Sequence, residues 1–322
     1  MDLFTQFLAN DLSEVSNTIE YWERIPKYFL NAKQIEKLIP EKGQPDPYKY
    51  EYRVKNSAGV EMPYKVVIQP ALIEQLDGKF KAFFPTKTEE NIEEVLKKIF
   101  TEQNYGIHDP NNIESWVKFS YNMIRKELYR MKRGLRHDQI KNSLEIMSRC
   151  IITVYEDGRE IYTGAILQDY CSIDRSKYLN DTESLHVARL PLFISHAINT
   201  LQYRQFNYVR FMECSEQLTR FLYKRLVNRF INANYLNDYH FTFSDIQQAS
   251  GLLQQQRDID NRRKVIDALD ELKAKNVIID YQTDERKNGR KITDVKYVIR
   301  PHQEFITEQK AANKRANLAQ IK

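Results

Sequence analysis

The stretch that decides the fold runs from Glu216 to Arg300 and reads EQLTRFLYKRLVNRFINANYLNDYHFTFSDIQQASGLLQQQRDIDNRRKVIDALDELKAKNVIIDYQTDERKNGRKITDVKYVIR. Its first part predicts a core helix, because apolar side chains recur at the three- and four-residue spacing of one helical face. These side chains are Leu218, Phe221, Leu222, Leu226 and Phe230.

Two more helices are expected after it. The segment from Phe243 to Gly251 predicts a short helix that has Ser244 as its cap, carries Ile246 inward and stops at the glycine. The segment from Arg257 to Lys275 predicts a longer helix. Its expected buried residues are Ile259, Ile266, Leu269 and Leu272. Its outward residues, the candidates for reading DNA bases, are Arg257, Asp260, Asn261, Arg263 and Lys264.

A β-hairpin with a basic tip completes the stretch. Val277–Tyr281 and Ile292–Ile299 predict two strands, and Asn288-Gly289 between them predicts a tight turn. The connection carries four cations suited to phosphate contacts, Arg286, Lys287, Arg290 and Lys291. Helix, short helix, longer helix and hairpin are the outline of a winged helix, a helix-turn-helix fold that places one helix in the DNA major groove. The mixed charge of the longer helix keeps a protein-binding role open as an alternative.

The same outline occurs earlier in the chain. Helices are expected from Glu89 to Gln103, within Trp116–Met131, and from Arg136 to Arg149, where the apolar residues form one stripe. A hairpin then joins Ile151–Tyr155 to Glu160–Leu167 through the turn signal Asp157-Gly158. Further candidates for base contacts in the third helix are Lys141 and Asn142.

The densest run of cations lies at the junction of the second and third helices of this first copy. It consists of Arg125, Lys126, Arg130, Lys132, Arg133 and Arg136. Such a run is often only a solvated helix face, but its place at a helix-turn-helix junction favours contacts with phosphates. Each phosphate neutralised in this way makes binding more salt-dependent.

Composition sets limits on the class of protein. The chain has 322 residues, 42% of them hydrophobic, and a net charge of +5, which fits globular domains and a polyanionic partner. The three cysteines lack the spacing of a disulfide framework or a zinc site, so we expect a cytoplasmic protein without metal or cofactor. No apolar run predicts a membrane span. A His-x-His pair and a Gly-x4-Gly-Lys phosphate loop are both missing, so we do not expect an enzyme.

A family resemblance becomes specific between the two copies. His186–Met212 predicts a Leu-Pro-started helix and an aromatic strand, and a helix containing Phe221-Leu-Tyr-Lys-Arg-Leu226 follows. This order resembles the junction in the iteron-binding plasmid replication initiators, whose plan fits about Glu89 to Arg300. The resemblance implies that the second domain reads origin repeats, and that the first adds backbone contacts and a homodimer interface. It also implies host partners, a helicase and an initiator, whereas residues 1–88 exceed what minimal initiators carry.

We therefore predict an α+β fold of two tandem winged-helix domains preceded by an N-terminal helix and β-hairpin region. The predicted limits are 1–88 for that region, 89–190 and 191–305 for the two domains, and 306–322 for a flexible basic tail. In the N-terminal region, Asp2–Tyr28 predicts an amphipathic helix, and Tyr48–Val54 with Tyr64–Gln69 predicts the hairpin.

The function expected is sequence-specific binding of repeated double-stranded sites at an origin, which initiates plasmid replication. A winged-helix transcription regulator without initiator activity is the alternative. A nicking or recombining enzyme is a third class, and it would need a metal or tyrosine site that the sequence does not reveal.

Overall fold

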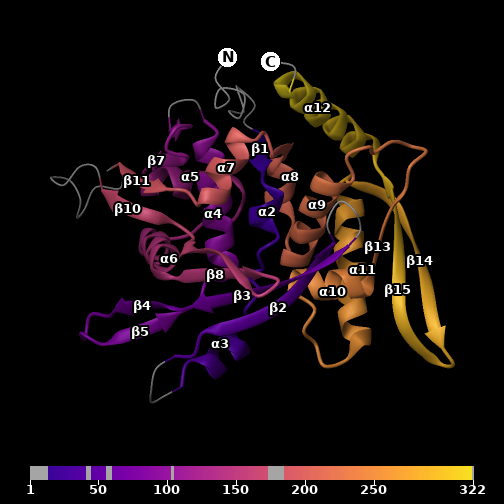
Figure 1. Cartoon of the computed structure of the whole chain (residues 1–322), viewed down its shortest axis with the longest axis horizontal. Coiled ribbons are helices and arrows are strands. Elements are labelled where there is room, and N and C mark those ends of the chain that lie inside the picture. The colour runs from indigo at the N-terminus through magenta and orange to yellow at the C-terminus, as the bar shows by residue number, and fades with distance from the viewer. Residues whose placement is uncertain (1–13, 41–44, 56–59, 103–104, 173–184, 321–322) are drawn as a thin grey trace. The chain divides into compact units, whose positions relative to one another are not determined.

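The chain divides into two compact units that both mix helices with small β-sheets. The computed structural model describes residues 14–40, 45–55, 60–102, 105–172 and 185–320 (Figure 1). The first unit comprises Met1–Glu51 and Pro63–Gln202, and the second comprises Tyr52–Met62 and Tyr203–Lys322. The four-part division drawn from the sequence stays a prediction.

The first unit holds six of the described helices and most of the strands. The helices are α2 (Glu20–Glu23), α3 (Ala32–Leu38), α4 (Lys87–Phe100), α5 (Tyr121–Arg130), α6 (His137–Arg149) and α7 (Leu192–Asn199). The strands are β1 (Val15–Thr18), β2 (Tyr48–Lys55), β3 (Glu61–Gln69), β4 (Ala71–Glu74), β5 (Phe80–Phe83), β6 (Gly106–Asp109), β7 (Glu114–Phe119), β8 (Ile151–Glu156), β9 (Arg159–Ala165), β10 (Gln168–Ser172) and β11 (His186–Arg189). The sheets have the orders β2-β3-β8-β9, β10-β11-β7-β6 and β4-β5. The tip of the β2–β3 hairpin belongs to the second unit.

Helix α4 organises the core of the first unit. It corresponds to the helix predicted from Glu89, it buries Ile92, Val95, Leu96 and Ile99, and it starts at a capping box formed by Thr86 and Glu89. On the same helix the buried Glu93 carboxylate accepts hydrogen bonds from the Trp22 indole and, at 2.8 Å, from the Tyr28 hydroxyl. The Lys27 ammonium lies 3.7 Å from this carboxylate, so the segment around Trp22 is anchored on α4.

Several predictions for the first unit are confirmed and two are wrong. The hairpin of β8 and β9 turns at Asp157-Gly158, where both residues have positive φ, as a type I′ turn requires. Trp116 lies in strand β7 and not in a helix, because the side chains of β7 alternate between buried and less buried positions. The expected helix over Asp2–Tyr28 is interrupted by β1, and residues 1–13 lie outside the described part.

The second unit contains five helices within its described residues. They are α8 (Tyr208–Glu213), α9 (Gln217–Arg229), α10 (Phe243–Ser250), α11 (Asp258–Ala274) and α12 (Gln303–Gln320). The strands are β12 (Arg204–Asn207), β13 (Tyr239–Thr242), β14 (Ile278–Asn288) and β15 (Lys291–Pro301). An antiparallel sheet has the order β13-β15-β14. From α9 to β15 the order is helix, strand, helix, helix and hairpin, and α4 to β9 follows the same order except that two strands, β6 and β7, come after its first helix.

The C-terminal segment is a helix in the structure and not the flexible tail that was predicted from the sequence. Residues 306–322 were expected to form a flexible basic tail, but as far as Gln320 they belong to α12, whose Phe305 and Ile306 are buried. The Arg204 guanidinium donates hydrogen bonds of 2.8 Å to the side-chain oxygens of Gln309 and Asn313. These contacts attach the helix to β12, which composition alone does not indicate.

Candidate nucleic-acid interface

The turn between α10 and α11 is built by local hydrogen bonds. Helix α10 starts at a capping box of Thr242 and Asp245, and it ends at Gly251, whose φ of 68° is the left-handed conformation predicted for that residue. The predicted cap, Ser244, has another role. Its backbone N–H and its hydroxyl donate to the Asp294 carboxylate at 3.1 and 2.7 Å, which ties α10 to β15.

Asn261 fixes the start of α11 and does not face solvent. Its side-chain oxygen accepts from the Gln255 backbone N–H at 2.9 Å, and its amide donates to the Gln255 backbone oxygen at 3.0 Å. The residue is 1% exposed. The prediction that Asn261 reads a base is therefore wrong, because both ends of its amide are used to hold the turn.

The C-terminal half of α11 is held by neighbouring elements. The Glu271 carboxylate accepts from the Ser215 backbone N–H and from the Thr219 hydroxyl, each at 2.5 Å. Burial alone would raise the pKa of Glu271, but the hydrogen bonds to its carboxylate have the larger effect. The pKa of Glu271 therefore lies below its usual value. On the outer side of the helix, the Tyr281 hydroxyl donates to Asp270 at 2.8 Å, and Lys273 pairs with Asp280 at 3.2 Å.

The N-terminal half of α11 presents open side chains. Among the described residues, Arg263 and Lys264 are exposed and have no ion pair. Arg257, the N-cap, is exposed but pairs with Asp260 at 2.8 Å. Ile259 was expected to be buried and is 57% exposed, since the buried face of the helix passes through other residues. That face consists of Asn261, Val265, Ala268, Leu269 and Leu272.

A long basic hairpin lies beside this helix. Strands β14 and β15 have 11 residues each, and Figure 1 shows them as an extended ribbon next to α11. The predicted connection between Tyr281 and Ile292 is mostly strand. The turn consists of Gly289 and Arg290, because Asn288 is still a strand partner of Lys291. Of the two turn residues, Gly289 has a positive φ and Arg290 does not.

The four predicted phosphate contacts on the hairpin differ in their surroundings. All four are exposed. Lys287 pairs with Glu285 at 2.9 Å, and Arg286 lies opposite Asp294 in the register of the strands. Arg290 and Lys291 lie at the turn and form no ion pair with a described residue. The end of the hairpin is therefore the most cationic part of it.

The basic cluster of the first unit lies on α5 and on the turn that leads into α6. Arg125, Lys126 and Lys132 are exposed and have no ion-pair partner within the described ranges. Arg130 pairs with Glu127 at 2.6 Å, and Arg136 pairs with Asp138 at 3.0 Å. The remaining residue of the cluster, Arg133, is half-buried. Of the two base-contact candidates on α6, Lys141 is exposed and Asn142 is half-buried.

The hairpin of the first unit differs from that of the second. Strand β8 pairs with β3 as well as with β9, so one edge of the hairpin is covered by another strand. Around its turn Glu156 lies opposite Arg159 in the register of the strands, and Asp157 forms the turn itself. This tip carries no excess of cations, whereas the β14–β15 tip does.

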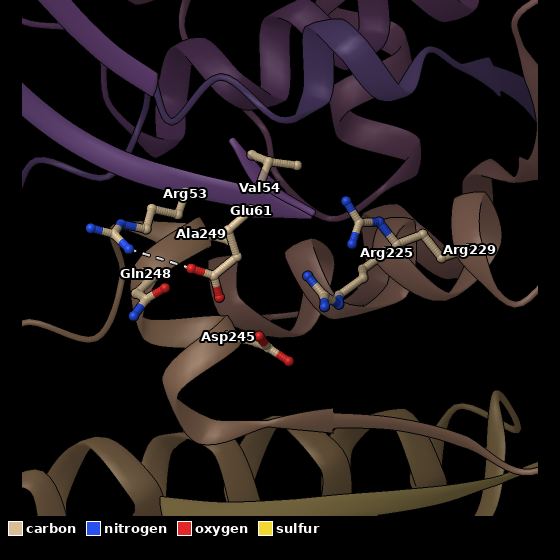
Figure 2. Close-up of a pocket in the computed structure, with 8 residues that line it drawn as sticks. All are labelled: Arg53, Val54, Glu61, Arg225, Arg229, Asp245, Gln248 and Ala249. Atoms are coloured by element: carbon tan, nitrogen blue, oxygen red, sulfur yellow. Dashed lines mark hydrogen bonds and ion pairs between the residues drawn. The ribbon is translucent and has the colours of Figure 1, made fainter. Parts of the chain in front are cut away.

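A narrow pocket of the second unit includes no residue of α11 in its lining. It is lined by Arg53, Val54, Glu61, Arg225, Arg229, Asp245, Gln248 and Ala249 (Figure 2). Arg53 and Glu61 form an ion pair of 3.4 Å across the hairpin tip. Three guanidinium groups share the pocket with two carboxylates, one of which is paired with Arg53.

Two residues that sequence reasoning passed over belong to the candidate interface. Gln255 and Gln256 are exposed and come directly before α11. A side-chain amide can make two hydrogen bonds to the major-groove edge of adenine. The sequence feature that could have indicated these residues is the run of three glutamines after the turn, because it is polar and lies next to the start of the helix.

Comparisons with known proteins give matches among solved structures only. No protein-family model and no curated protein matches the chain. A selenomethionine structure of domains 2 and 3 of RctB is 12% identical, with a TM-score of 0.47, over 82% of this chain and 94% of that one. The Pi initiator protein in complex with iteron DNA is 12% identical, with a TM-score of 0.45, over 67% of this chain and 91% of that one. The Pi protein is an initiator bound to iteron DNA, which is the kind of protein that the sequence resemblance named.

The described residues contain neither a membrane-spanning helix nor a cluster of metal-binding side chains. None of their helices has both the length and the apolar character that a membrane crossing requires. Within the same ranges, no three His, Cys, Asp or Glu side chains are grouped so that they could hold a metal ion.

Proposed function

We propose that the chain binds double-stranded DNA sequence-specifically and initiates replication at an origin with repeated sites. In this proposal the two copies of the outline, α4 to β9 and α9 to β15, are winged-helix domains. The second copy reads base edges through the N-terminal half of α11, and its hairpin contacts phosphates. The first copy supplies phosphate contacts through α5 and the turn before α6.

The observation that carries the proposal is the contrast between the two halves of α11. The C-terminal half is tied to β14 by Asp270 and to α9 by Glu271, whereas the N-terminal half leaves Arg263 and Lys264 open. A major groove about 12 Å wide admits one helix, and helix-turn-helix proteins contact bases with the N-terminal residues of that helix. The long hairpin beside α11 ends in cations suited to the adjacent backbone.

Division of labour follows from the kinds of side chain in each place. Arginine can make two parallel hydrogen bonds to guanine, so Arg263 is suited to base reading. Arg125, Lys126 and Lys132 are separate cations on a helix and a turn, and they are suited to phosphates, which carry no sequence information. We expect the first set to govern specificity and the second to govern affinity for any duplex.

The proposal is tested by selecting duplexes from a random library with the full chain. We expect one short motif to be enriched and to occur as repeats beside the coding sequence. A plasmid carrying those repeats should replicate only when the protein is supplied. Enrichment of no motif would refute sequence-specific binding.

The alternatives give different results in the same experiments. An enriched motif without replication would favour the transcription regulator. A nicked strand or a covalent protein-DNA adduct would favour an enzyme and contradict the assignment made here.

A further inference from the structure

Ile259 has an unusual position for a large aliphatic residue. It lies in the first turn of α11 and is 57% exposed. Each residue of an α-helix turns the chain by about 100°, so Ile259 points about 200° away from the buried Asn261. No packing within the described residues accounts for a β-branched side chain there, since the buried face of the helix lies on the other side.

The neighbours of Ile259 limit what this face can contact. Arg263 lies one turn further along, on the same side of the helix, and is exposed without an ion pair among the described residues. One more turn toward the C-terminus, the outward position Asp267 is acidic, and Asp270 is engaged by Tyr281. Arg262 and Ile266 on the same side are half-buried, and the Arg262 guanidinium group lies over the Phe243 ring. The exposed part of the face before Asp267 is therefore Ile259 next to Arg263.

We propose that Ile259 is a specificity residue that contacts the 5-methyl group of a thymine, beside a guanine held by Arg263. This inference rests on the proposed DNA binding by α11. Thymine is the base that offers a methyl group in the major groove, and guanine offers the two acceptors that suit arginine. An aliphatic and a cationic side chain one turn apart match a thymine near a guanine in the recognised site.

The test compares thymine with uracil, which lacks only the 5-methyl group. Each thymine of the selected duplex is replaced singly by deoxyuridine, and binding of the full chain is measured by fluorescence anisotropy at one salt concentration. Burial of one methyl group predicts that affinity falls about fourfold at one thymine for the unmodified protein. The Ile259→Ala variant should bind more weakly and lose the difference between thymine and uracil at that position. Ile259→Val should retain part of it.

A matched control separates this contact from a general effect of removing an exposed isoleucine. Ile279 on β14 is 47% exposed, so Ile279→Ala removes a similar side chain from the same unit outside α11. It should keep the full preference for thymine. If the unmodified protein binds its site but ignores every uracil replacement, or if Ile259→Ala keeps the preference, the assignment is overturned while DNA binding stands. If no duplex is bound specifically, the proposed function itself fails.

Discussion

The hairpin tip gives the most quantitative prediction of this structure. Arg290 and Lys291 are exposed at the β14–β15 turn and are free of ion pairs among the described residues. Replacing both with glutamine removes two cations without removing the backbone contacts of the turn. Each lost phosphate contact should reduce the slope of log affinity against log salt by about 0.9, so the double variant should lose about 1.8.

The expected effect is large enough to measure by anisotropy. A fourfold rise in salt, from about 50 to about 200 mM, changes log affinity by about 1.1 less for the double variant than for the unmodified chain. The unmodified chain should therefore lose about tenfold more affinity over this range than the variant does. The measurement uses a selected duplex and a scrambled one, and the change in slope should be the same for both.

Lys273 and Lys275 provide the matched control, because replacing them with glutamine also removes two positive charges. Lys273 pairs with Asp280 at 3.2 Å, and Lys275 pairs with Glu213 at 3.0 Å, both near the C-terminal end of α11. This variant should keep nearly the original slope. Equal losses of slope in the two double variants would show that net charge, and not the hairpin tip, determines the salt dependence. An unchanged slope in the tip variant would refute the hairpin's phosphate role.

Three further predictions concern other parts of the chain. Asn261→Ala should lower the free energy of unfolding by about 1 to 3 kcal/mol, measured by urea denaturation, because the Gln255 backbone loses both partners; an unchanged unfolding midpoint would contradict this. Burial, and then the charge of His137, lowers the pKa of His186 to about 4. In the unfolded chain the histidine binds a proton near pH 6.5, so the free energy of unfolding should fall as the pH drops from about 6.5 to about 4. The His186→Phe variant should show a smaller fall, and a variant with the same pH dependence as the unmodified chain would refute the role of His186. Replacing Arg125 and Lys126 with glutamine should weaken binding to specific and scrambled duplexes by the same factor, and a larger loss for the specific duplex would contradict the separation of roles.

Local periodicity predicted much of the helical framework. The stripe through Leu218, Leu222 and Leu226 is buried in α9, and that through Ile140, Leu144 and Met147 is buried in α6. The turns at Gly158 and Gly251 were also predicted, because a left-handed residue favours glycine. These features depend on residues that are close in sequence.

Features that depend on distant contacts could not be predicted in the same way. The buried face of α11 was predicted to include Ile259, because isoleucine is hydrophobic. The observed buried face instead includes Asn261 and Val265. The structure buries the asparagine because its amide satisfies both backbone groups of Gln255 across the turn. Trp116 was misplaced for a similar reason, since β7 is short and is stabilised by pairing with β6 and β11.

The candidate interface shows the same limits. Exposure of Arg263, Lys264, Arg290 and Lys291 followed from the sequence, but their lack of an ion pair among the described residues did not. Arg257 and Lys287 look equivalent to these residues in the sequence, yet each pairs with a nearby carboxylate in the structure. Such pairing depends on which side chains face one another.

The most direct measurement of the central claim is the ratio of affinities for the selected and the scrambled duplex, for the unmodified chain and for Arg263→Ala. If the N-terminal half of α11 reads bases, Arg263→Ala should reduce discrimination by about 1 to 3 kcal/mol and leave binding to the scrambled duplex nearly unchanged. A ratio that stays the same, or an equal loss of affinity for both duplexes, would contradict base reading by α11.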